Sequence, residues 1–334
     1  MRLRALARIL ILTAMTFVLG VVLAGGAPAD SAAQGGLIAI PSGHDSDLKF
    51  YAADGGIVTG ADALERSLSA GLILWVAGNQ FFAMDKVIGE FQRSEPRLSV
   101  GLITLPPGLI MSAILGGGWT YGGREYRFTP DVYASVNLGH LRKLRASGLM
   151  SQYETYMHNE LQIMVSKANP KHVTGIDDLV RADIRTSMPN PVSEGIMQFY
   201  ARKVLERHGI WQKISGGKEC ASCQTTDNNY FTAVHHRETP ERIRDGKSDA
   251  GIVWKTEVLE AQRHGASVDA VELPVSDSLR DEVSYAVGAL DNGKHKASAD
   301  RFLMFVASPA GQAAYAAFGF ASASPDELRL KPIE

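Results

Sequence analysis

The sequence predicts an α/β fold of two lobes, each a mixed, mostly parallel sheet flanked by helices. Short, continuous apolar runs such as residues 72–77 alternate along the chain with amphipathic helical patterns such as residues 81–91. Continuous apolar runs are typical of strands buried on both faces, and their alternation with helices is typical of sheets that helices cover. The length of 334 residues favours two lobes, because it exceeds the size at which a single hydrophobic core stops growing.

The expected strands and helices follow one another from Leu72 onward. Strands are expected at residues 72–77, 98–104, 131–135, 161–165, 184–188, 250–254 and 284–290, and helices at 81–91, 109–115, 176–179, 196–208, 239–244, 256–264, 297–306 and 309–318. Residues 34–70 show only weak periodicity and predict an N-terminal extension with a short helix near 61–69. Ligands of α/β sheets bind beyond the carboxyl ends of the strands, so the turns after the strands are candidate binding positions.

The N-terminus has the three parts of a secretory signal peptide. Three arginines precede an uncharged run at residues 9–24, and A-x-A-like sequences follow at 27–29 and 31–33. This order predicts a signal peptide over residues 1–33 and a periplasmic protein. An uncleaved membrane anchor is the less favoured alternative, because the apolar run falls slightly short of the roughly 20 residues that span a bilayer.

Charge and motifs indicate a binding protein and not an enzyme. The net charge is −2, and it becomes −4 without residues 1–33, which hold three Arg and one Asp. This mild acidity offers no basic footprint for nucleic acid or for an anionic membrane surface. We find no nucleophile elbow, no H-E-x-x-H and no phosphate-binding loop in the sequence, and we expect no cofactor.

Two cysteines, Cys220 and Cys223, stand in a stretch with the composition of a loop. In an exported protein this spacing favours a small disulfide loop. One alternative is a metal site that combines both cysteines with His235 and His236, and another is a redox-active pair. A disulfide and a metal site exclude each other, because metal ligation requires free thiolates.

Three stretches together resemble the periplasmic molybdate-binding proteins of ABC importers, which belong to the type II solute-binding proteins. They are residues 199–211, residues 249–256 with the sequence D-A-G-I-V-W-K-T, and residues 299–320 with S-P-A-G-Q at the start of a helix. The similarity covers about residues 72–320.

The resemblance implies two lobes that close around a small anion, for which molybdate or tungstate is the leading candidate. It places lobe I at residues 71–155 and at 271–334 with the C-terminal tail, and lobe II at 156–270. It also implies a monomer that delivers its ligand to a membrane permease.

Carrying the family's binding positions onto this chain gives a mixed set of candidate contacts. The first-turn hydroxyl falls at Asn79, a backbone amide contact near His236, and the family's tyrosine at Trp254. The second-turn serines fall on Pro106, Pro107 and Gly108, where the prolines have no N–H to donate. The full set of candidate ligand contacts is Asn79, Gln80, Gly108, Ser135, Asn190, Ser193, His236, Arg237 and Trp254.

These departures leave the ligand open. Neutral donors that converge on one point hold an oxyanion, and one such cluster is replaced here by prolines. Arg237, a helix start near Ser193 and Asn79 still support an anion. The alternatives are a larger organic acid and a metal bound by the two cysteines together with His235 and His236.

Overall fold

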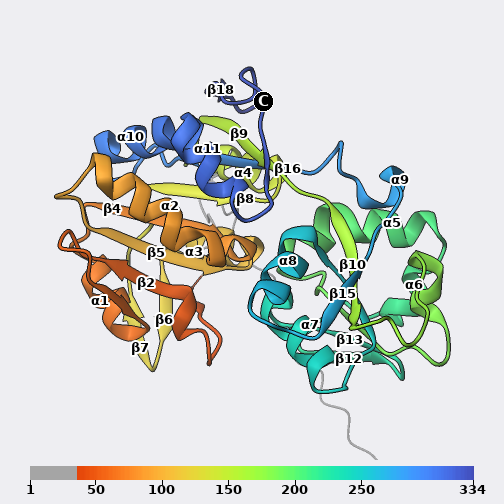
Figure 1. Ribbon diagram of the computed structural model, residues 1–334. Helices are drawn as coiled ribbons and strands as arrows, with labels where there is room; N and C mark the ends of the chain where they lie inside the picture. Colours follow the sequence, from red (N-terminus) through yellow and green to blue (C-terminus); the bar gives the residue numbers. More distant parts are fainter. Residues whose placement is uncertain (1–35) are drawn as a thin grey trace, which may run out of the picture. The chain divides into compact units, whose positions relative to one another are not determined.

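Two mixed β-sheets organise residues 36–334, the part of the chain that this computed structural model describes (Figure 1). The larger sheet has nine strands in the order β17-β9-β16-β8-β4-β5-β2-β3, with β18 also paired to β9. Its strands are β2 (Leu48–Tyr51), β3 (Ile57–Thr59), β4 (Leu72–Ala77), β5 (Val100–Leu105), β8 (Val132–Ser135), β9 (Gln152–His158), β16 (Ser284–Ala289), β17 (Ala321–Ser322) and β18 (Lys331–Pro332). We call the part of the molecule built on this sheet lobe I.

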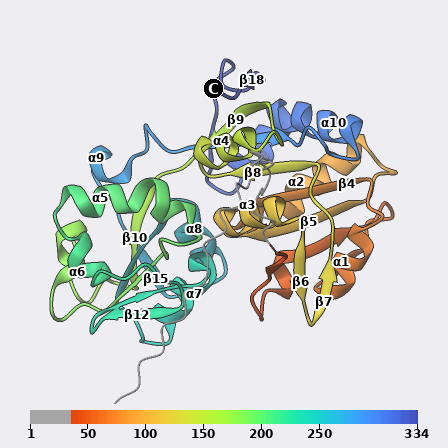
Figure 2. The ribbon, with the colours of Figure 1, turned by 180° about the vertical axis from the view of Figure 1, so that it is seen from behind.

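The second sheet has six strands in the order β12-β13-β11-β14-β10-β15 and forms lobe II (Figure 2). Its strands are β10 (Leu161–Ser166), β11 (Thr186–Met188), β12 (Cys223–Thr226), β13 (Asn229–Phe231), β14 (Ala250–Trp254) and β15 (Val268–Val271). The chain passes from lobe I to lobe II between β9 and β10, and it returns between β15 and β16. The two-lobed α/β fold predicted from the sequence is therefore confirmed.

Parallel pairing is confined to the middle of each sheet. In lobe I, β4 pairs in parallel with β5 and β8, and in lobe II, β11 pairs in parallel with β13 and β14. All other pairs in these two sheets are antiparallel. The expectation of mostly parallel sheets was too strong, because the short edge strands and β9 were not predicted, and because the predicted strands β10 and β16 pair in antiparallel register.

Helices cover both faces of β4, which explains its uninterrupted apolar sequence. Leu72, Leu74 and Val76 join the cluster that includes α2 (Phe81–Ser94), α10 (Lys296–Ala307) and α11 (Pro309–Ala316). Ile73 and Trp75 point to the other face, toward α1 (Ala61–Ser67), α3 (Pro107–Gly116) and α4 (Leu138–Ala146). Alternate residues of a strand face opposite sides of the sheet, so both sides of β4 must be apolar.

Residues 36–70 belong to lobe I and are not an extension, which corrects the sequence interpretation. Strand β2 pairs with β5 in antiparallel register, and β3 continues the sheet beyond it. The predicted short helix is present as α1. The strands were missed because each has only a few residues and half-buried positions carry polar side chains, as Lys49 shows. The segment at 116–127 likewise forms a hairpin of β6 (Trp119–Tyr121) and β7 (Arg124–Tyr126), and β6 also pairs with β1 (Ile38–Ala39).

The predicted signal peptide, residues 1–33, lies outside the described residues. Within residues 36–334, no helix is both long and apolar enough to cross a membrane.

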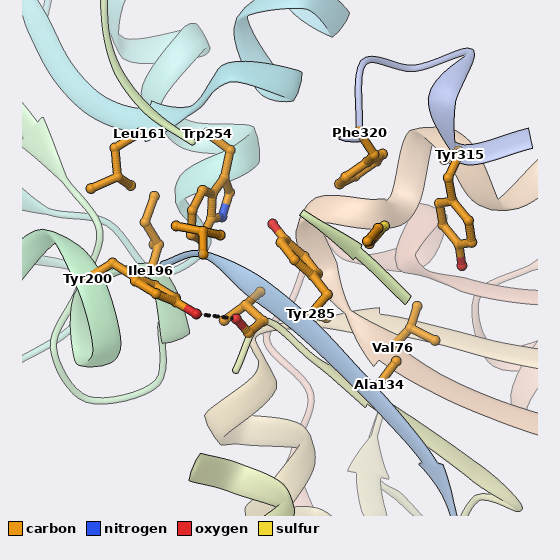
Figure 3. Packing of buried hydrophobic residues seen from close by; sticks show 14 of the residues in the cluster. Val76, Ala134, Leu161, Ile196, Tyr200, Trp254, Tyr285, Tyr315 and Phe320 are labelled. Carbon is orange, nitrogen blue, oxygen red and sulfur yellow. Dashed lines mark hydrogen bonds between the residues drawn. The ribbon is translucent and has the colours of Figure 1, made fainter. Parts of the chain in front are cut away.

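A cluster of aromatic side chains lies where the two lobes meet (Figure 3). The Trp254 ring packs on Tyr200 and Tyr285, with ring centroids 5.6 and 5.9 Å away. Tyr200 also donates from its hydroxyl to the carbonyl of Val136 in lobe I, over 2.8 Å. The core is therefore continuous from β14 of lobe II to β16 of lobe I.

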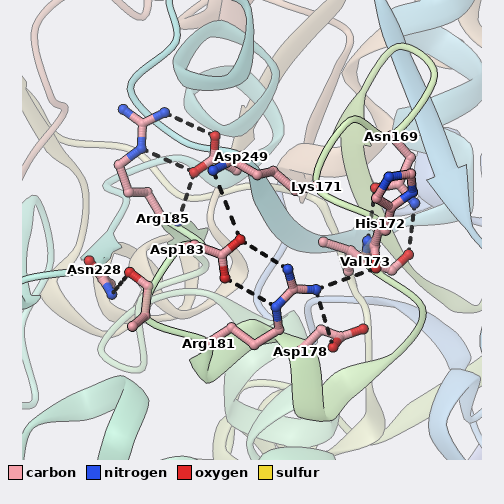
Figure 4. A network of polar contacts seen from close by, with 11 residues as sticks. Asn169, Lys171, His172, Val173, Asp178, Arg181, Asp183, Arg185, Asn228 and Asp249 are labelled. Carbon is pink, nitrogen blue, oxygen red and sulfur yellow. Dashed lines mark hydrogen bonds and ion pairs between the residues drawn. The ribbon is translucent and has the colours of Figure 1, made fainter.

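The far edge of lobe II is held by charged contacts (Figure 4). The Arg185 guanidinium binds both carboxylate oxygens of Asp249, and Arg181 does the same with Asp183. The Arg185–Asp249 pair ties the start of β11 to the start of β14. Because both arginines are exposed and solvent screens their charges, the network sets local geometry more than stability.

Candidate functional site

The first turn of the site follows β4 and forms a single 3-10 turn, Gly78–Gln80. The Asn79 side chain is buried and its Nδ2 donates to the Tyr285 hydroxyl over 2.5 Å. Gln80 Oε1 accepts from the Tyr156 hydroxyl over 2.7 Å. One polar atom of each side chain, Asn79 Oδ1 and Gln80 Nε2, is buried without a hydrogen-bond partner among the described residues. Such atoms are costly to bury, so they mark a place where a ligand can satisfy them.

Asn79 can present either an acceptor or a donor to that ligand. The Tyr285 hydroxyl also accepts from Asn159 Nδ2, over 3.2 Å, and still has its own hydrogen to donate. If the Asn79 carboxamide turns by half a rotation, its oxygen accepts this hydrogen and its N–H group becomes the unpartnered one. Asn79, which stands where the resemblance places a hydroxyl, can therefore still offer a donor to an anion.

His236 and Arg237 come from lobe II and meet lobe I at the same turn. They lie in the first turn of α7 (His235–Arg244), and the His236 ring stacks on Phe81 with centroids 5.2 Å apart. A Cβ on Gly78 would come within 2.4 Å of the His236 ring, so only glycine lets the imidazole approach the turn. Both ring nitrogens of His236 and the Nε of Arg237 lack partners among the described residues. Burial holds the pKa of His236 well below its usual value, so the ring is neutral and offers one donor and one acceptor.

Helix α7 begins earlier than the sequence predicted, at His235 and not near Thr239. The backbone N–H groups of Ala233 and Val234 both donate to Glu238 Oε1, over 2.8 Å each. This carboxylate satisfies free N–H groups at the helix start and fixes the turn that holds the histidines. His235 and His236 were expected in a loop, and they instead form the rigid first turn of a helix.

Arg237 is already paired with a buried carboxylate from lobe I. Its Nη2 lies 2.6 Å from Asp47 Oδ1, and its guanidinium carbon lies 3.9 Å from the centroid of the Phe81 ring. Asp47 also accepts from Thr104 Oγ1 over 3.1 Å and contacts His44 Nδ1 at 2.9 Å. Burial would raise the pKa of Asp47, but the His44 hydrogen bond and the Arg237 charge together hold it below its usual value. The pair with Asp47 uses Nη2, and the buried Nε of Arg237 has no partner among the described residues and can bind a ligand.

His235 does not face the lobe interface and is enclosed within lobe II. Its Nδ1 lies 2.8 Å from Glu194 Oε2 and its Nε2 lies 3.1 Å from Glu257 Oε1, and all three side chains are buried. The two contacts are not well aligned for hydrogen bonding, so we describe them as ion pairs. Burial lowers the pKa of His235, but the two carboxylates overcome this and raise it to about 10. The three side chains join α7, α8 (Lys255–Arg263) and the segment before the π-turn at Met197–Ala201.

Trp254 ends β14 at the base of the site. Its backbone N–H donates to Glu257 Oε2 over 3.1 Å, and its indole Nε1 is buried without a partner among the described residues. Trp254 can therefore offer a single N–H donor to a ligand.

The other four predicted contacts have protein partners. Gly108 N–H donates to the Ser193 carbonyl over 3.1 Å, Ser135 Oγ lies 3.0 Å from His140 Nδ1, and the Ser193 N–H donates to Asn190 Oδ1 over 2.8 Å. Asn190 Nδ2 donates to the carbonyls of Thr232 and Ala233. These residues lie at the junction of the lobes or shape its loops, and they leave no free donor of their own.

The structure contradicts the metal alternative. Cys220 and Cys223 form a disulfide, as predicted, with their Cα atoms 6.3 Å apart. His235 is held by two glutamates and His236 packs on Phe81. Within residues 36–334, no group of three His, Cys, Asp or Glu side chains is placed to hold a metal ion.

Sequence reasoning missed four residues that shape the site: Asp47, Glu194, Glu257 and Tyr285. Glu257 is the third residue of α8, a position from which a carboxylate caps the preceding backbone. Glu194 stands two residues before the predicted helix start at 196, where an acidic side chain favours the helix N-terminus. Asp47 lay in the segment interpreted as an extension, so no local signal pointed to it.

A cavity of about 490 Å³ opens beside His236 and Arg237. Phe81 and Phe82 of lobe I form one wall, and residues of α7 and α8 in lobe II form the other. The free polar atoms of the first turn and this cavity together make the candidate binding site.

Residues 72–321 match the family of bacterial extracellular solute-binding proteins. Among curated proteins, a sulfate-binding protein of Synechococcus elongatus is 25% identical over 170 residues, which are 49% of this chain and 47% of that protein. A putative ABC transporter substrate-binding lipoprotein of Bacillus subtilis is 22% identical over 57% of this chain and 66% of its own length. The chain thus spans less than two thirds of each of these two relatives.

Solved structures share the fold. The periplasmic molybdate-binding protein of Azotobacter vinelandii aligns with a TM-score of 0.57 and 16% identity, over 76% of this chain and all of that one. The sulfate-binding protein SubI of Mycobacterium tuberculosis aligns with a TM-score of 0.57 and 18% identity, over 77% of this chain and 88% of that one. At these identities the likeness establishes a common architecture and leaves the ligand to be argued from the site.

Proposed function

This chain belongs to the family of bacterial extracellular solute-binding proteins, and we propose that it captures a small anion in the periplasm for an ABC importer. The family consists of binding proteins and not of enzymes. We further propose that residues 1–33 direct export, that the mature protein is a monomer, and that lobe II, built on β10 to β15, moves against lobe I, which includes residues 36–70 and β9. A membrane permease is the expected partner of the ligand-bound form.

One observation carries the proposal: buried polar atoms without partners among the described residues belong to both lobes, in the turn after β4 and in His236, which lies against Gly78 of that turn. Three of them are N–H donors, namely Gln80 Nε2, Trp254 Nε1 and Arg237 Nε. Neutral His236 adds one more donor, and Asn79 adds another when its carboxamide turns by half a rotation. N–H groups fixed by the fold stabilise a negative charge without having to reorganise.

A tetrahedral oxyanion is the ligand class that the relatives support. Two of the proteins named above are described as sulfate-binding and one as molybdate-binding. Molybdate, tungstate and sulfate are therefore the first ligands to test.

A thermal-melt screen of the mature protein at fixed pH tests the proposal. Molybdate, tungstate, sulfate, phosphate and small carboxylates are added singly. A ligand at a hundred times its Kd should stabilise the protein by about 2.7 kcal/mol and raise the melting temperature by several degrees. If none of these anions shifts the melt, the proposed function is wrong.

The matched variants are Trp254→Phe, which removes the unpartnered indole N–H, and Trp211→Phe, which alters a tryptophan stacked on Phe231 elsewhere in lobe II. Each ligand-induced shift is measured against the variant's own unliganded melting temperature. We expect the shift to shrink in Trp254→Phe and to stay unchanged in Trp211→Phe. If the ligand-induced shift of the melting temperature is the same in both variants, the indole N–H of Trp254 does not bind the ligand.

A further inference from the structure

We propose that the natural ligand is an organic acid with one negative charge, whose anionic head binds at His236 and Arg237 and whose uncharged body fills the adjacent cavity. This inference rests on the proposed function and specifies the chemical class of the anion.

The size of the cavity is the first argument. At about 490 Å³ it could hold on the order of sixteen water molecules, each of which takes about 30 Å³ in the liquid. A bare tetrahedral oxyanion would displace only a few of them. Pockets of about 300–1,000 Å³ are typical of organic ligands and cofactors.

The mixed polarity of the residues that line the cavity is the second argument. His236 and Arg237 belong to the lining, and three buried nitrogen atoms of these two side chains have no partner within residues 36–334. The apolar part of the lining includes Phe82, Pro240 and Ala261. An anionic head satisfies the nitrogens, and an apolar body removes the wall from water at about 25 cal/mol for each Å² buried.

Charge on the cavity wall is the third argument, and it selects against bare divalent anions. Three carboxylates, Glu241, Glu257 and Glu260, line the cavity. Arg263 balances Glu260, Asp47 balances Arg237 and Asp245 balances Arg244, whereas His235 is shared between Glu194 and Glu257, and Glu241 forms no ion pair among the described residues. The lining is therefore net negative, and it repels a doubly charged oxyanion more than a singly charged head with a neutral body.

Calorimetric titration of the mature protein at pH 7 with a graded series of probes tests this inference. The probes are sulfate, molybdate, methanesulfonate and benzenesulfonate, so that charge and body size change separately. We expect benzenesulfonate to bind about tenfold or more tightly than methanesulfonate, and both sulfonates to bind more tightly than sulfate.

A variant that fills the outer part of the cavity separates the body from the head. Ala261→Phe should reduce benzenesulfonate affinity to the level of methanesulfonate and leave methanesulfonate within about twofold of wild type. The control is Ala297→Phe, at an exposed position of α10, which should change neither affinity. Because the wild-type series alone discriminates, the test holds even if Ala261→Phe folds poorly.

The failures of the two proposals differ. Tighter binding of molybdate or sulfate than of either sulfonate would overturn this inference and leave anion capture intact. Equal binding of the two sulfonates would also overturn it, because the cavity would then contribute nothing. Binding of none of the four probes would overturn this inference and count against the proposed function as well.

Discussion

The imidazole of His235 lies between two buried carboxylates, Glu194 and Glu257. We expect His235→Gln to lower the free energy of unfolding at pH 7 by about 3–5 kcal/mol, since Glu194 and Glu257 would then be buried without a counter-ion. Urea denaturation of both proteins measures the difference.

The pH dependence of that loss has a definite sign. Because the pKa of His235 is raised in the folded state to about 10, its contribution is fully present below the unfolded pKa of about 6.5. This contribution declines as the pH rises from there toward 10. The difference in the free energy of unfolding between His235→Gln and the wild type should therefore narrow in alkaline solution. His264→Gln serves as the control, because His264 is an exposed partner of Glu260 and should matter by no more than about 0.5 kcal/mol. If both variants lose the same small amount, the buried ion pairs are not formed.

At the scale of single residues, the turns of the site could be located from the sequence, but the hydrogen-bond partners of their side chains could not. Asn79 and Trp254 lie at the junction of the lobes, where strand ends were expected to place them. Ser135 and Ser193 lie close by, yet they bind His140 and Asn190. Which hydroxyl stays free depends on side chains distant in sequence, and no local pattern encodes that choice.

At the level of elements, the agreement follows length and burial. The strands predicted at residues 72–77 and 250–254 are confirmed without shift as β4 and β14, because all their side chains are buried and apolar. Strand β9 was missed, since its sequence Q-Y-E-T-Y-M-H mixes polar and apolar residues along a strand that is only partly buried. The predicted helix 196–208 is present as a π-turn followed by α5 (Arg202–Arg207), a distinction that periodicity cannot make.

The turn after β4 depends on Gly78, and its substitution gives a test of the site's geometry. In Gly78→Ala the new methyl group would overlap the His236 ring and lie 3.2 Å from the backbone of Leu105. Because relief of such overlap costs about 1–3 kcal/mol, we expect affinity for the best anion to fall by about tenfold or more. Calorimetry measures the affinity.

The matched glycine is Gly89, which is exposed in the middle of α2 with no atom within 4 Å of the position that a Cβ would take. Gly89→Ala should bind normally and gain about 0.5–1 kcal/mol of stability, because glycine is a poor helix former. Normal affinity in Gly78→Ala would show that the position of His236 does not govern binding.

For the whole molecule, contacts on both sides of the site hold the two lobes together. On one side Asn137 and His140 of lobe I meet Tyr200 and Gln198 of lobe II. On the other side Asp47 of lobe I binds Arg237 of lobe II. Arg237 and Tyr200, which make these contacts, also adjoin the unpartnered atoms: Arg237 carries one of them and Tyr200 packs on Trp254. The family match begins at residue 72, and Asp47 therefore adds a segment outside that match to the wall of the site.

The Asp47–Arg237 pair should couple closure of the lobes to ligand binding. Asp47→Asn removes the charge that orients the guanidinium, so the closed form becomes less favourable and anion affinity should fall by about 5- to 100-fold. Asp45→Asn makes the same change of charge two residues away, at an exposed side chain, and should leave affinity unaltered. Because the pKa of Asp47 is held below its usual value, the wild-type advantage should persist at neutral and mildly acidic pH and disappear only as that carboxylate takes up a proton. Tighter anion binding by Asp47→Asn would mean the reverse, namely that Asp47 competes with the ligand for Arg237 and keeps the site occupied until an anion displaces it.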